Sequence, residues 1–295
     1  MALINVTGCN LCGKTAAQLL YKVNSFCIVK CKYCGLVYVN QPPGKEELGR
    51  LYQKNYFQGK TTYKNMTFGY ADYLENSKAL SALNLKRLKS IEKYQKKGRI
   101  LDIGCAAGIF LRAAKSQGWE AYGVEINKDM AEYARQEFGL NVFDGELEKK
   151  RFPDEFFDVV CMWDVIEHHL NPRKFLEEIH RILKKRGMVC IETPNIDSIW
   201  ARYKKARWEE HLKPPEHLFY FSRSTLSSML NKTGFGVLKA WTETDFAKWL
   251  YDWQKERITM QTLFWQLKHI AVKLIDLPAQ RMGLSNKLVM LGVKV

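Results

Sequence analysis

Apolar and polar residues alternate in two different ways along the chain, and the pattern changes near residue 98. From residue 99 onward, short apolar runs are separated by amphipathic stretches whose apolar positions recur every three to four residues. The short runs predict buried strands, and the stretches between them predict helices. This alternation indicates a doubly wound α/β fold, with a mostly parallel sheet covered by helices on both faces. The expected strands are 99–103, 120–124, 140–143, 157–162, 188–192, 236–241 and 287–293, and the expected helices are 109–117, 128–138 and 172–184.

The first 97 residues lack this alternation, and we expect them to form separate elements. Apolar runs at 26–29 and 36–39 predict two short strands. A Pro-Pro-Gly stretch follows, and the residues up to about 70 show no period, so we interpret them as a connector. Residues 72–97 predict an amphipathic helix whose lysine face either is solvated or contacts RNA or a membrane. The predicted domains are 1–45, 46–97 with the connector and helix, and 98–295.

Four of the eight cysteines form the pattern Cys-x2-Cys-x18-Cys-x2-Cys, at Cys9, Cys12, Cys31 and Cys34. This spacing predicts a four-thiolate zinc site. A glycine follows each pair, where a residue free to adopt positive φ lets backbone N–H groups point at sulfur. We therefore predict that residues 1–45 form a zinc ribbon. Because the protein supplies all four ligands, the predicted Zn²⁺ is structural.

The composition of the 295 residues, 46% of them apolar, is that of a globular protein with a full core. No run approaches the roughly 18 apolar residues of a membrane helix, and the first residues lack the pattern of a signal peptide, so we expect a cytoplasmic protein. The formal net charge of +15 attracts polyanions such as RNA, anionic lipid or nucleotide-linked substrates. Charge alone does not choose among them, and an ordinary basic surface explains it equally well.

Residues 102–108 form the turn between the first strand and the first helix of the predicted sheet, where open parallel sheets bind cofactors. The turn lacks the Gly-x-Gly-x-x-Gly pattern of dinucleotide sites, and it carries Asp102 two residues before Gly104. A carboxylate there disfavours a pyrophosphate but suits a cationic amine, and the helix N-terminus that follows suits a carboxylate. A second acid, Glu125, ends the next strand and can accept the hydroxyl groups of a ribose.

Together, these residues resemble the class I S-adenosylmethionine-dependent methyltransferases, in the branch of the ubiquinone-biosynthesis O-methyltransferases. The resemblance covers residues 97–240 and includes the turn, Gly-Val-Glu at 123–125 and Trp-Asp-Val-Ile-Glu-His at 163–168. The N-terminal four-cysteine ribbon is also similar to this group. The resemblance implies a seven-stranded sheet with an antiparallel final strand and methyl transfer by in-line displacement. One departure is Ala106, where many members carry the middle glycine of the turn.

The resemblance also implies roles for individual residues. Asp102 orders the turn or meets the amino group of S-adenosylmethionine, the turn glycines let the backbone approach, and Glu125 holds the ribose. Asp144 and Gly145 border the adenine, and Asp164 lies near the reacting sulfur. The residues expected to bind the cofactor are Asp102, Gly104, Cys105, Gly108, Glu125, Asp144, Gly145 and Asp164.

His217 and His168 are the candidates for a catalytic base. A base is needed only for acceptors such as hydroxyl groups, because the sulfonium is already a reactive donor. We prefer His217, in the Pro-Pro-Glu-His segment expected to fold back over the cleft, although a hydrogen bond that pins this segment is an equal alternative. Asp164, Glu167 and His168 also resemble a metal motif of the ubiquinone enzymes. Because Glu-His follows the fourth strand in relatives without a metal, we do not predict a second ion there.

The acceptor side is expected in two aromatic and basic segments, 196–223 and 246–275. The second segment forms either a surface for a membrane or partner or, more simply, part of the core. The function hypothesis is methyl transfer to a hydroxyl or carbon of a small molecule such as a sugar, lipid or secondary metabolite. An RNA methyltransferase is an alternative, but the Asn/Asp-Pro-Pro-Phe/Tyr motif of many base N-methylating enzymes is replaced by Trp-Asp-Val-Ile at 163–166. A non-catalytic S-adenosylmethionine-binding scaffold is another, and the sequence does not specify an oligomeric state.

Overall fold

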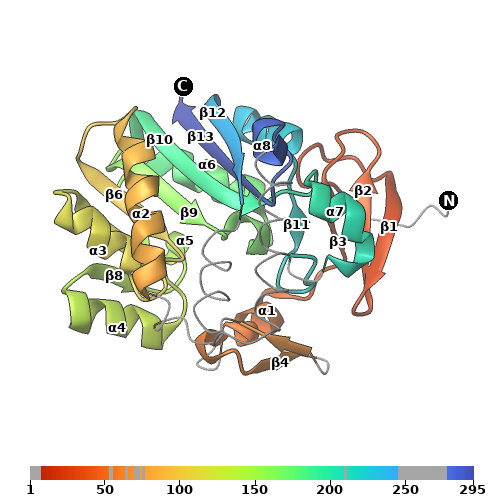
Figure 1. Ribbon diagram of the computed structural model, residues 1–295, viewed down its shortest axis with the longest axis horizontal. Helices are drawn as coiled ribbons and strands as arrows, with labels where there is room; N and C mark the ends of the chain where they lie inside the picture. The colour runs from red at the N-terminus through yellow and green to blue at the C-terminus, as the bar shows by residue number, and fades with distance from the viewer. Residues whose placement is uncertain are drawn as a thin grey trace, which may run out of the picture.

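A seven-stranded sheet forms the centre of the computed structural model, which describes residues 8–52, 56–63, 66–69, 74, 77–208, 211–244 and 278–295. Neighbouring strands pair in parallel from β10 to β8, and β13 runs antiparallel to both of its neighbours. The predicted doubly wound sheet with an antiparallel last strand is therefore confirmed (Figure 1). In sheet order, the strands are β12 (Phe235–Glu243), β13 (Lys287–Lys294), β10 (Leu183–Pro194), β9 (Phe157–Trp163), β6 (Arg99–Ile103), β7 (Glu120–Glu125) and β8 (Asn141–Asp144).

Helices cover both faces of this sheet because successive strand residues point to opposite sides. Ile100 packs into one core cluster and Leu101 into another. The cluster of Ile100 includes residues of α2, α3 and α4, whereas the cluster of Leu101 includes residues of α6 and α8. The helices are α2 (Ser77–Glu92), α3 (Ile109–Ser116), α4 (Lys128–Phe138), α5 (Leu147–Lys150), α6 (Pro172–Ile182) and α8 (Arg223–Lys232).

A second sheet of four strands contains both of the predicted N-terminal strands. It comprises β1 (Ala17–Val23), β2 (Phe26–Cys31), β3 (Val37–Asn40) and β11 (Phe219–Tyr220). β11 comes from the far end of the chain and pairs antiparallel with β3, as the right side of Figure 1 shows. One core cluster runs from ribbon residues such as Leu36 to residues of the large sheet such as Leu101. The ribbon and the large sheet therefore share a continuous apolar core.

The connector has more regular structure than the sequence indicated. It contains α1 (Lys45–Leu51), a 3-10 turn η1 (Tyr56–Gln58) and a small hairpin of β4 (Thr61–Tyr63) and β5 (Met66–Phe68). These elements are too short to show a period of their own. The predicted helix over 72–97 is α2, which begins later and ends earlier than predicted.

The first acceptor-side segment contains a short helix, α7 (Ile199–Lys204), and a 3-10 turn, η3 (Lys205–Arg207). A further 3-10 turn, η2 (Ile166–His168), follows β9. Within the described residues, none of the helices has the length and apolar character needed to cross a bilayer. The second segment, 246–275, lies outside the described residues.

Candidate functional site

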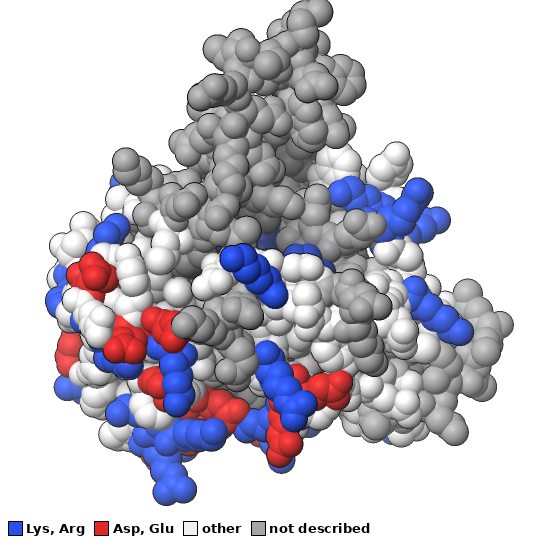
Figure 2. All heavy atoms as spheres, turned by 90° about the horizontal axis from the view of Figure 1, so that it is seen from below, with Lys and Arg blue, Asp and Glu red and all other residues white. Residues whose placement is uncertain are grey.

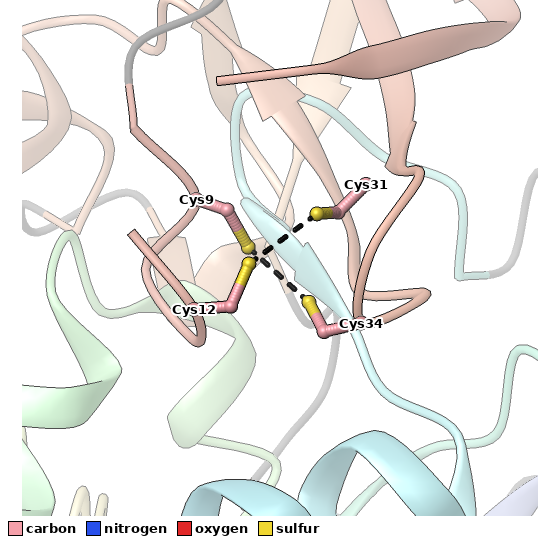
Figure 3. A group of neighbouring side chains, drawn as sticks. All are labelled: Cys9, Cys12, Cys31 and Cys34. Atoms are coloured by element: carbon pink, nitrogen blue, oxygen red, sulfur yellow. Dashed lines mark hydrogen bonds between the residues drawn. The ribbon is translucent and has the colours of Figure 1, made fainter. Parts of the chain in front are cut away.

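The four predicted metal ligands lie together, with their sulfur atoms directed at one another (Figure 3). The sulfur of Cys9 lies 3.5 Å from that of Cys34, and the sulfur of Cys12 lies 3.5 Å from that of Cys31. All four sulfur atoms lie within 4.8 Å of one another. Four thiolates around a tetrahedral zinc ion, each about 2.3 Å from it, lie roughly 3.8 Å apart. The donor set and its spacing therefore fit Zn²⁺.

Each cysteine pair closes a tight turn at the glycine that follows it, and the backbone N–H groups that lie at the sulfur atoms come from other residues of the turns. Gly13 and Gly35 have φ angles of 74° and 78°, and each donates its N–H to the carbonyl of the first cysteine of its pair. Burial raises the pKa of Cys31, but N–H groups of Cys34 and Tyr33 oppose this effect and bring the pKa down to about 7. Burial raises the pKa of Cys9 to about 11 and also raises the pKa of Cys34, so the thiols of the cluster differ in how readily they ionise.

The glycine turn, residues 102–108, joins β6 to α3 at the carboxyl edge of the large sheet. Gly104, Ala106 and Gly108 all have positive φ, of 71°, 46° and 75°. Ala106 thus adopts the left-handed conformation that favours glycine, as its replacement of the family's middle glycine requires. Glu125, at the end of β7, is buried and accepts the N–H groups of Ala106 and Asn127, each at 2.8 Å. Glu125 therefore ties the turn to the neighbouring strand.

Asp102 is only 2% exposed, and its Oδ1 atom has no hydrogen-bond partner among the described residues. Burial raises its pKa well above the usual range, Arg87 partly opposes this shift, and Glu125 adds to it. Arg87, on α2, stacks over Trp163 and forms an ion pair with Glu192 at 2.7 Å. A buried carboxylate oxygen without a partner is a costly feature unless a ligand group completes it.

The other residues expected at the cofactor have different surroundings. Asp144 lies beside Glu125 in the strand register and Gly145 donates its N–H to the carbonyl of Glu125 at 2.8 Å, so both share the edge of the turn. Cys105 packs its side chain into the core beneath the turn. Asp164 follows β9 with φ 55°, and Lys287 donates to its Oδ1 at 2.6 Å. A sequence pattern cannot reveal this pair, because Lys287 comes from the last strand.

The two candidate bases lie against each other, with ring centroids 4.7 Å apart. The Nδ1 atom of His217 lies 2.6 Å from the carbonyl oxygen of His211, and that of His168 lies 2.8 Å from the carbonyl oxygen of Glu216. A carbonyl only accepts, so each Nδ1 carries the proton and each Nε2 keeps its lone pair. Burial lowers the pKa of both rings, and for His217 the neighbouring His168 lowers it further. Both rings are therefore neutral bases near pH 7.

Two tyrosines of the connector complete what we call the histidine cluster, which comprises Tyr52, Tyr56, His168, Glu216 and His217. The hydroxyl of Tyr52 lies 3.0 Å from Nδ1 of His168, and the hydroxyl of Tyr56 donates to Oε1 of Glu216 at 2.5 Å. The backbone carbonyl of Tyr52 also accepts the side-chain amide of Asn127, at 3.0 Å. Sequence reasoning missed both tyrosines and Glu216, and only the Pro-Pro-Glu-His motif gave a signal for the glutamate.

Glu167 lies directly beside the histidine cluster and is completely buried. Burial raises its pKa well above the usual range, and Asp164 adds to the shift. Thr193 lies close enough to oppose this shift, yet neither carboxylate oxygen makes a hydrogen bond of standard geometry with the described residues. Glu167, His168 and His217 offer ligand atoms within 4.8 Å of one another, whereas Asp164 is occupied by Lys287. Among the described residues, Glu167 and His168 are thus grouped with His217, and Asp164 is paired with Lys287 instead.

A doubly wound seven-stranded sheet with this strand order and this turn defines the fold class of S-adenosylmethionine-dependent methyltransferases. A crystal structure of such an enzyme from Archaeoglobus fulgidus has the same fold, with a TM-score of 0.52 and 24% identity over 76% of this chain and all of that one. A putative methyltransferase of Haloferax volcanii, solved in complex with the activator Trm112, superposes with a TM-score of 0.53 and 19% identity over 74% of this chain and 93% of that one.

Sequence comparison agrees with this fold. Residues 73–240 match the family described as "Methyltransferase domain". The uncharacterised protein MJ1123 of Methanocaldococcus jannaschii is 32% identical over 164 residues, which cover 54% of this chain and 74% of that protein. A ubiquinone biosynthesis O-methyltransferase of Methylococcus capsulatus is 29% identical over 126 residues, which cover 40% of this chain and 53% of that enzyme. The chain belongs to this methyltransferase family, and it is an S-adenosylmethionine-dependent enzyme.

Proposed function

We propose that this enzyme transfers the methyl group of S-adenosylmethionine to a hydroxyl or carbon of a hydroxyl-bearing small molecule, with His217 as the general base. The observation that carries the proposal is the fixed tautomer of His217. Its Nδ1–H is held by the carbonyl of His211 at 2.6 Å, so Nε2 is the atom that accepts a proton. Burial holds its pKa well below 6.5, which keeps the ring neutral before the reaction. His168, held in the same way, is the second candidate base.

The cofactor half of the site comprises Asp102, Glu125 and the turn between them. When bound, S-adenosylmethionine supplies the electrophilic methyl group. The unpartnered Oδ1 of Asp102 suits its cationic amino group, and the positive-φ turn leaves backbone N–H groups at the start of α3 for its carboxylate. Both oxygens of Glu125 already accept backbone N–H groups, and each retains a lone pair for a ribose hydroxyl. Asp144 and Gly145 would border the adenine at the same edge, with Asp164 nearer the sulfur.

The acceptor half is the histidine cluster together with Glu167. Oε2 of Glu216 and both oxygens of Glu167 are buried polar atoms without a hydrogen bond of standard geometry to the described residues. Such atoms are completed by a ligand rich in hydroxyl donors, which favours a sugar or another polyol over a wholly apolar acceptor. On the face shown in Figure 2, the visible acidic side chains lie among the basic ones, so the basic excess does not form one continuous surface there. Trp-Asp-Val-Ile at 163–166, in place of the motif of many base N-methylating enzymes, favours a small molecule over RNA.

The experiment that tests this function follows the methyl label. The purified protein is incubated with methyl-labelled S-adenosylmethionine and an extract of its own cells, and the label is then partitioned among RNA, protein, lipid and small molecules. We expect the label in small molecules. Label in RNA would overturn the acceptor assignment. Cofactor binding with no label in any fraction would instead indicate a binding scaffold.

We propose separately that Cys9, Cys12, Cys31 and Cys34 hold one structural Zn²⁺. The four-sulfur geometry supports this assignment, and a site with four protein ligands leaves no position for substrate. Metal analysis should find about one zinc per chain. Cys31→Ser should lose it, whereas Cys27→Ser, which alters a cysteine of β2 outside the cluster, should retain it. Equal metal content in the two variants would refute the site.

A further inference from the structure

The segment that carries His217 is held by the ribbon sheet. β11 begins two residues after His217 and has only two residues, Phe219 and Tyr220, which pair with Tyr38 and Val37 of β3. A strand this short has no stability of its own and depends on the strand beside it. The N–H of Val39 donates to the carbonyl of Leu218 at 2.8 Å, which extends the contact to the residue next to His217.

Leu218 connects the ribbon to the histidine cluster. Its carbonyl accepts from β3, and its own N–H donates to the carbonyl of Glu167 at 2.8 Å. Glu167 lies next to His168 in the chain. The backbone around Leu218 therefore fixes the relative position of His217 and His168 through two hydrogen bonds, one of which comes from the ribbon.

The second cysteine pair forms the turn that holds β3 in place. β2 ends at Cys31, β3 begins at Val37, and the N–H of Cys31 donates to the carbonyl of Leu36 at 2.9 Å. In Figure 3 the ribbon around Cys31 and Cys34 forms this bend beside the other pair. A small ribbon depends on its metal for folding, so an open cysteine cluster would release the bend and loosen β3.

The first cysteine pair is attached to the methyltransferase body. Between Cys9 and Cys12, the side chain of Asn10 donates to Oδ1 of Asn171 at 2.9 Å and accepts the N–H of Arg173 at 3.0 Å. Asn171 is the N-cap of α6. The cysteine cluster thus lies between a fixed attachment on the body and the strand that carries the acceptor segment.

We infer that the ribbon is a metal-dependent positioning element for the acceptor half of the site. When the four cysteines hold their metal, β3 templates β11 and sets His217 against His168. When the metal is lost, the acceptor half loosens, while the glycine turn and Glu125 remain intact because the hydrogen bonds that order them come from β6, β7 and the loops after these strands, none of which belongs to the ribbon. The inference rests on the proposed role of His217, and it assigns the ribbon a function beyond that of a folding appendage.

The test compares Cys31→Ser with Cys27→Ser and with the zinc-loaded wild type. For Cys31→Ser we expect amide hydrogen exchange across residues 211–221 to accelerate by roughly tenfold or more, because this backbone loses its template. The affinity for S-adenosylmethionine, measured by calorimetry, should stay within about twofold, since its proposed ligands are untouched. Methyl transfer should fall by about 10²-fold through misplacement of the base, with a higher KM for the acceptor. Cys27→Ser should resemble the wild type in all measurements.

Chelation of the wild-type protein followed by zinc addition gives the same comparison without a substitution, and the exchange rates should rise and then recover. Loss of S-adenosylmethionine binding on metal removal would overturn the inference, because the ribbon would then support the whole domain. Unchanged exchange across 211–221 would also overturn it. If His217→Gln leaves transfer intact, the proposed base is wrong, whereas the exchange and affinity measurements still decide whether the ribbon holds the segment.

Discussion

The proposed cofactor half of the site comes from one stretch of about 25 residues, whereas the acceptor half comes from three distant segments. Asp102, the glycine turn and Glu125 lie at the ends of adjacent parallel strands, and the backbone N–H of Ala106 donates to the side chain of Glu125 across them. The histidine cluster instead joins the connector, η2 and the segment before β11. Its geometry depends on how separate elements pack. The first half is thus encoded locally and the second by tertiary contacts, so the two should respond differently to substitution.

Substitution of the proposed base, His217, should separate the two halves most clearly, because it should affect methyl transfer and leave cofactor binding unchanged. His217→Gln should reduce methyl transfer by about 10²- to 10⁴-fold, the range for loss of a general base, while the affinity for S-adenosylmethionine stays unchanged. His169→Asn is the matched control, because His169 turns away from the cluster, stacks on Phe175 and contacts Glu148. Steady-state kinetics and calorimetry measure both quantities. A full-rate His217→Gln enzyme would mean that the histidine only pins the segment.

In the cofactor half, Gly108 is a position where the fold requires glycine. A Cβ there would come within 2.6 Å of Leu140 Cδ1 and 3.0 Å of Ala134 Cβ, and its φ is 75°. Gly108→Ala should cost about 1–3 kcal/mol from overpacking in addition to the cost of positive φ. Gly118→Ala measures the cost of positive φ without overpacking, since Gly118 has φ 88° and open space around the position that a Cβ atom would occupy. Denaturant unfolding compares the two, and equal losses would show that packing on α4 does not matter.

The pH dependence of stability should report the buried base. Burial lowers the pKa of His217 in the folded protein well below 6.5. As the pH falls below about 6.5, His217 therefore becomes protonated in the unfolded chain but stays neutral in the folded protein. The stability of the wild type relative to His217→Gln should therefore rise with pH, by up to about 1.4 kcal/mol per unit, and level off near pH 7.

The difference between the two proteins is the informative quantity. Buried acids such as Asp102 and Glu167 have raised pKa values, so their contribution to the free energy of unfolding falls as the pH rises, opposite to that of His217. Thermal unfolding from pH 5 to pH 7.5 measures the difference. A difference that does not change with pH would mean that folded His217 titrates as freely as in the unfolded chain.

The smallest expected effect is at Ala106. Ala106→Gly removes the cost of an alanine at φ 46° but adds flexibility to the unfolded chain, so stability should change by no more than about 1 kcal/mol, toward greater stability. Ala107→Gly, at a neighbouring buried alanine without positive φ, should destabilise. Urea unfolding distinguishes the two. Equal destabilisation by both would show that the turn prefers alanine at position 106.

The sequence predicted much of the cofactor side because its signals are short in range. The strands β6, β7 and β9 were placed within one or two residues of their observed ends, since apolar runs bounded by turns specify buried parallel strands. Cysteine spacing predicted the sulfur cluster for the same reason, because each pair occupies one tight turn. The connector elements were missed, as they carry too few residues for a period.

The sequence by itself determined the class of protein, the order of strands and helices, the glycine turn with its two acids and the grouping of the cysteines. These features depend on periodicity and on residues close together in the chain. Only the tertiary structure decided that β11 completes the ribbon, that Lys287 pairs with Asp164, and that Tyr52 and Glu216 surround His168. Such contacts join residues that are 48 or more positions apart, and their positions follow from packing among whole elements, which no local pattern records.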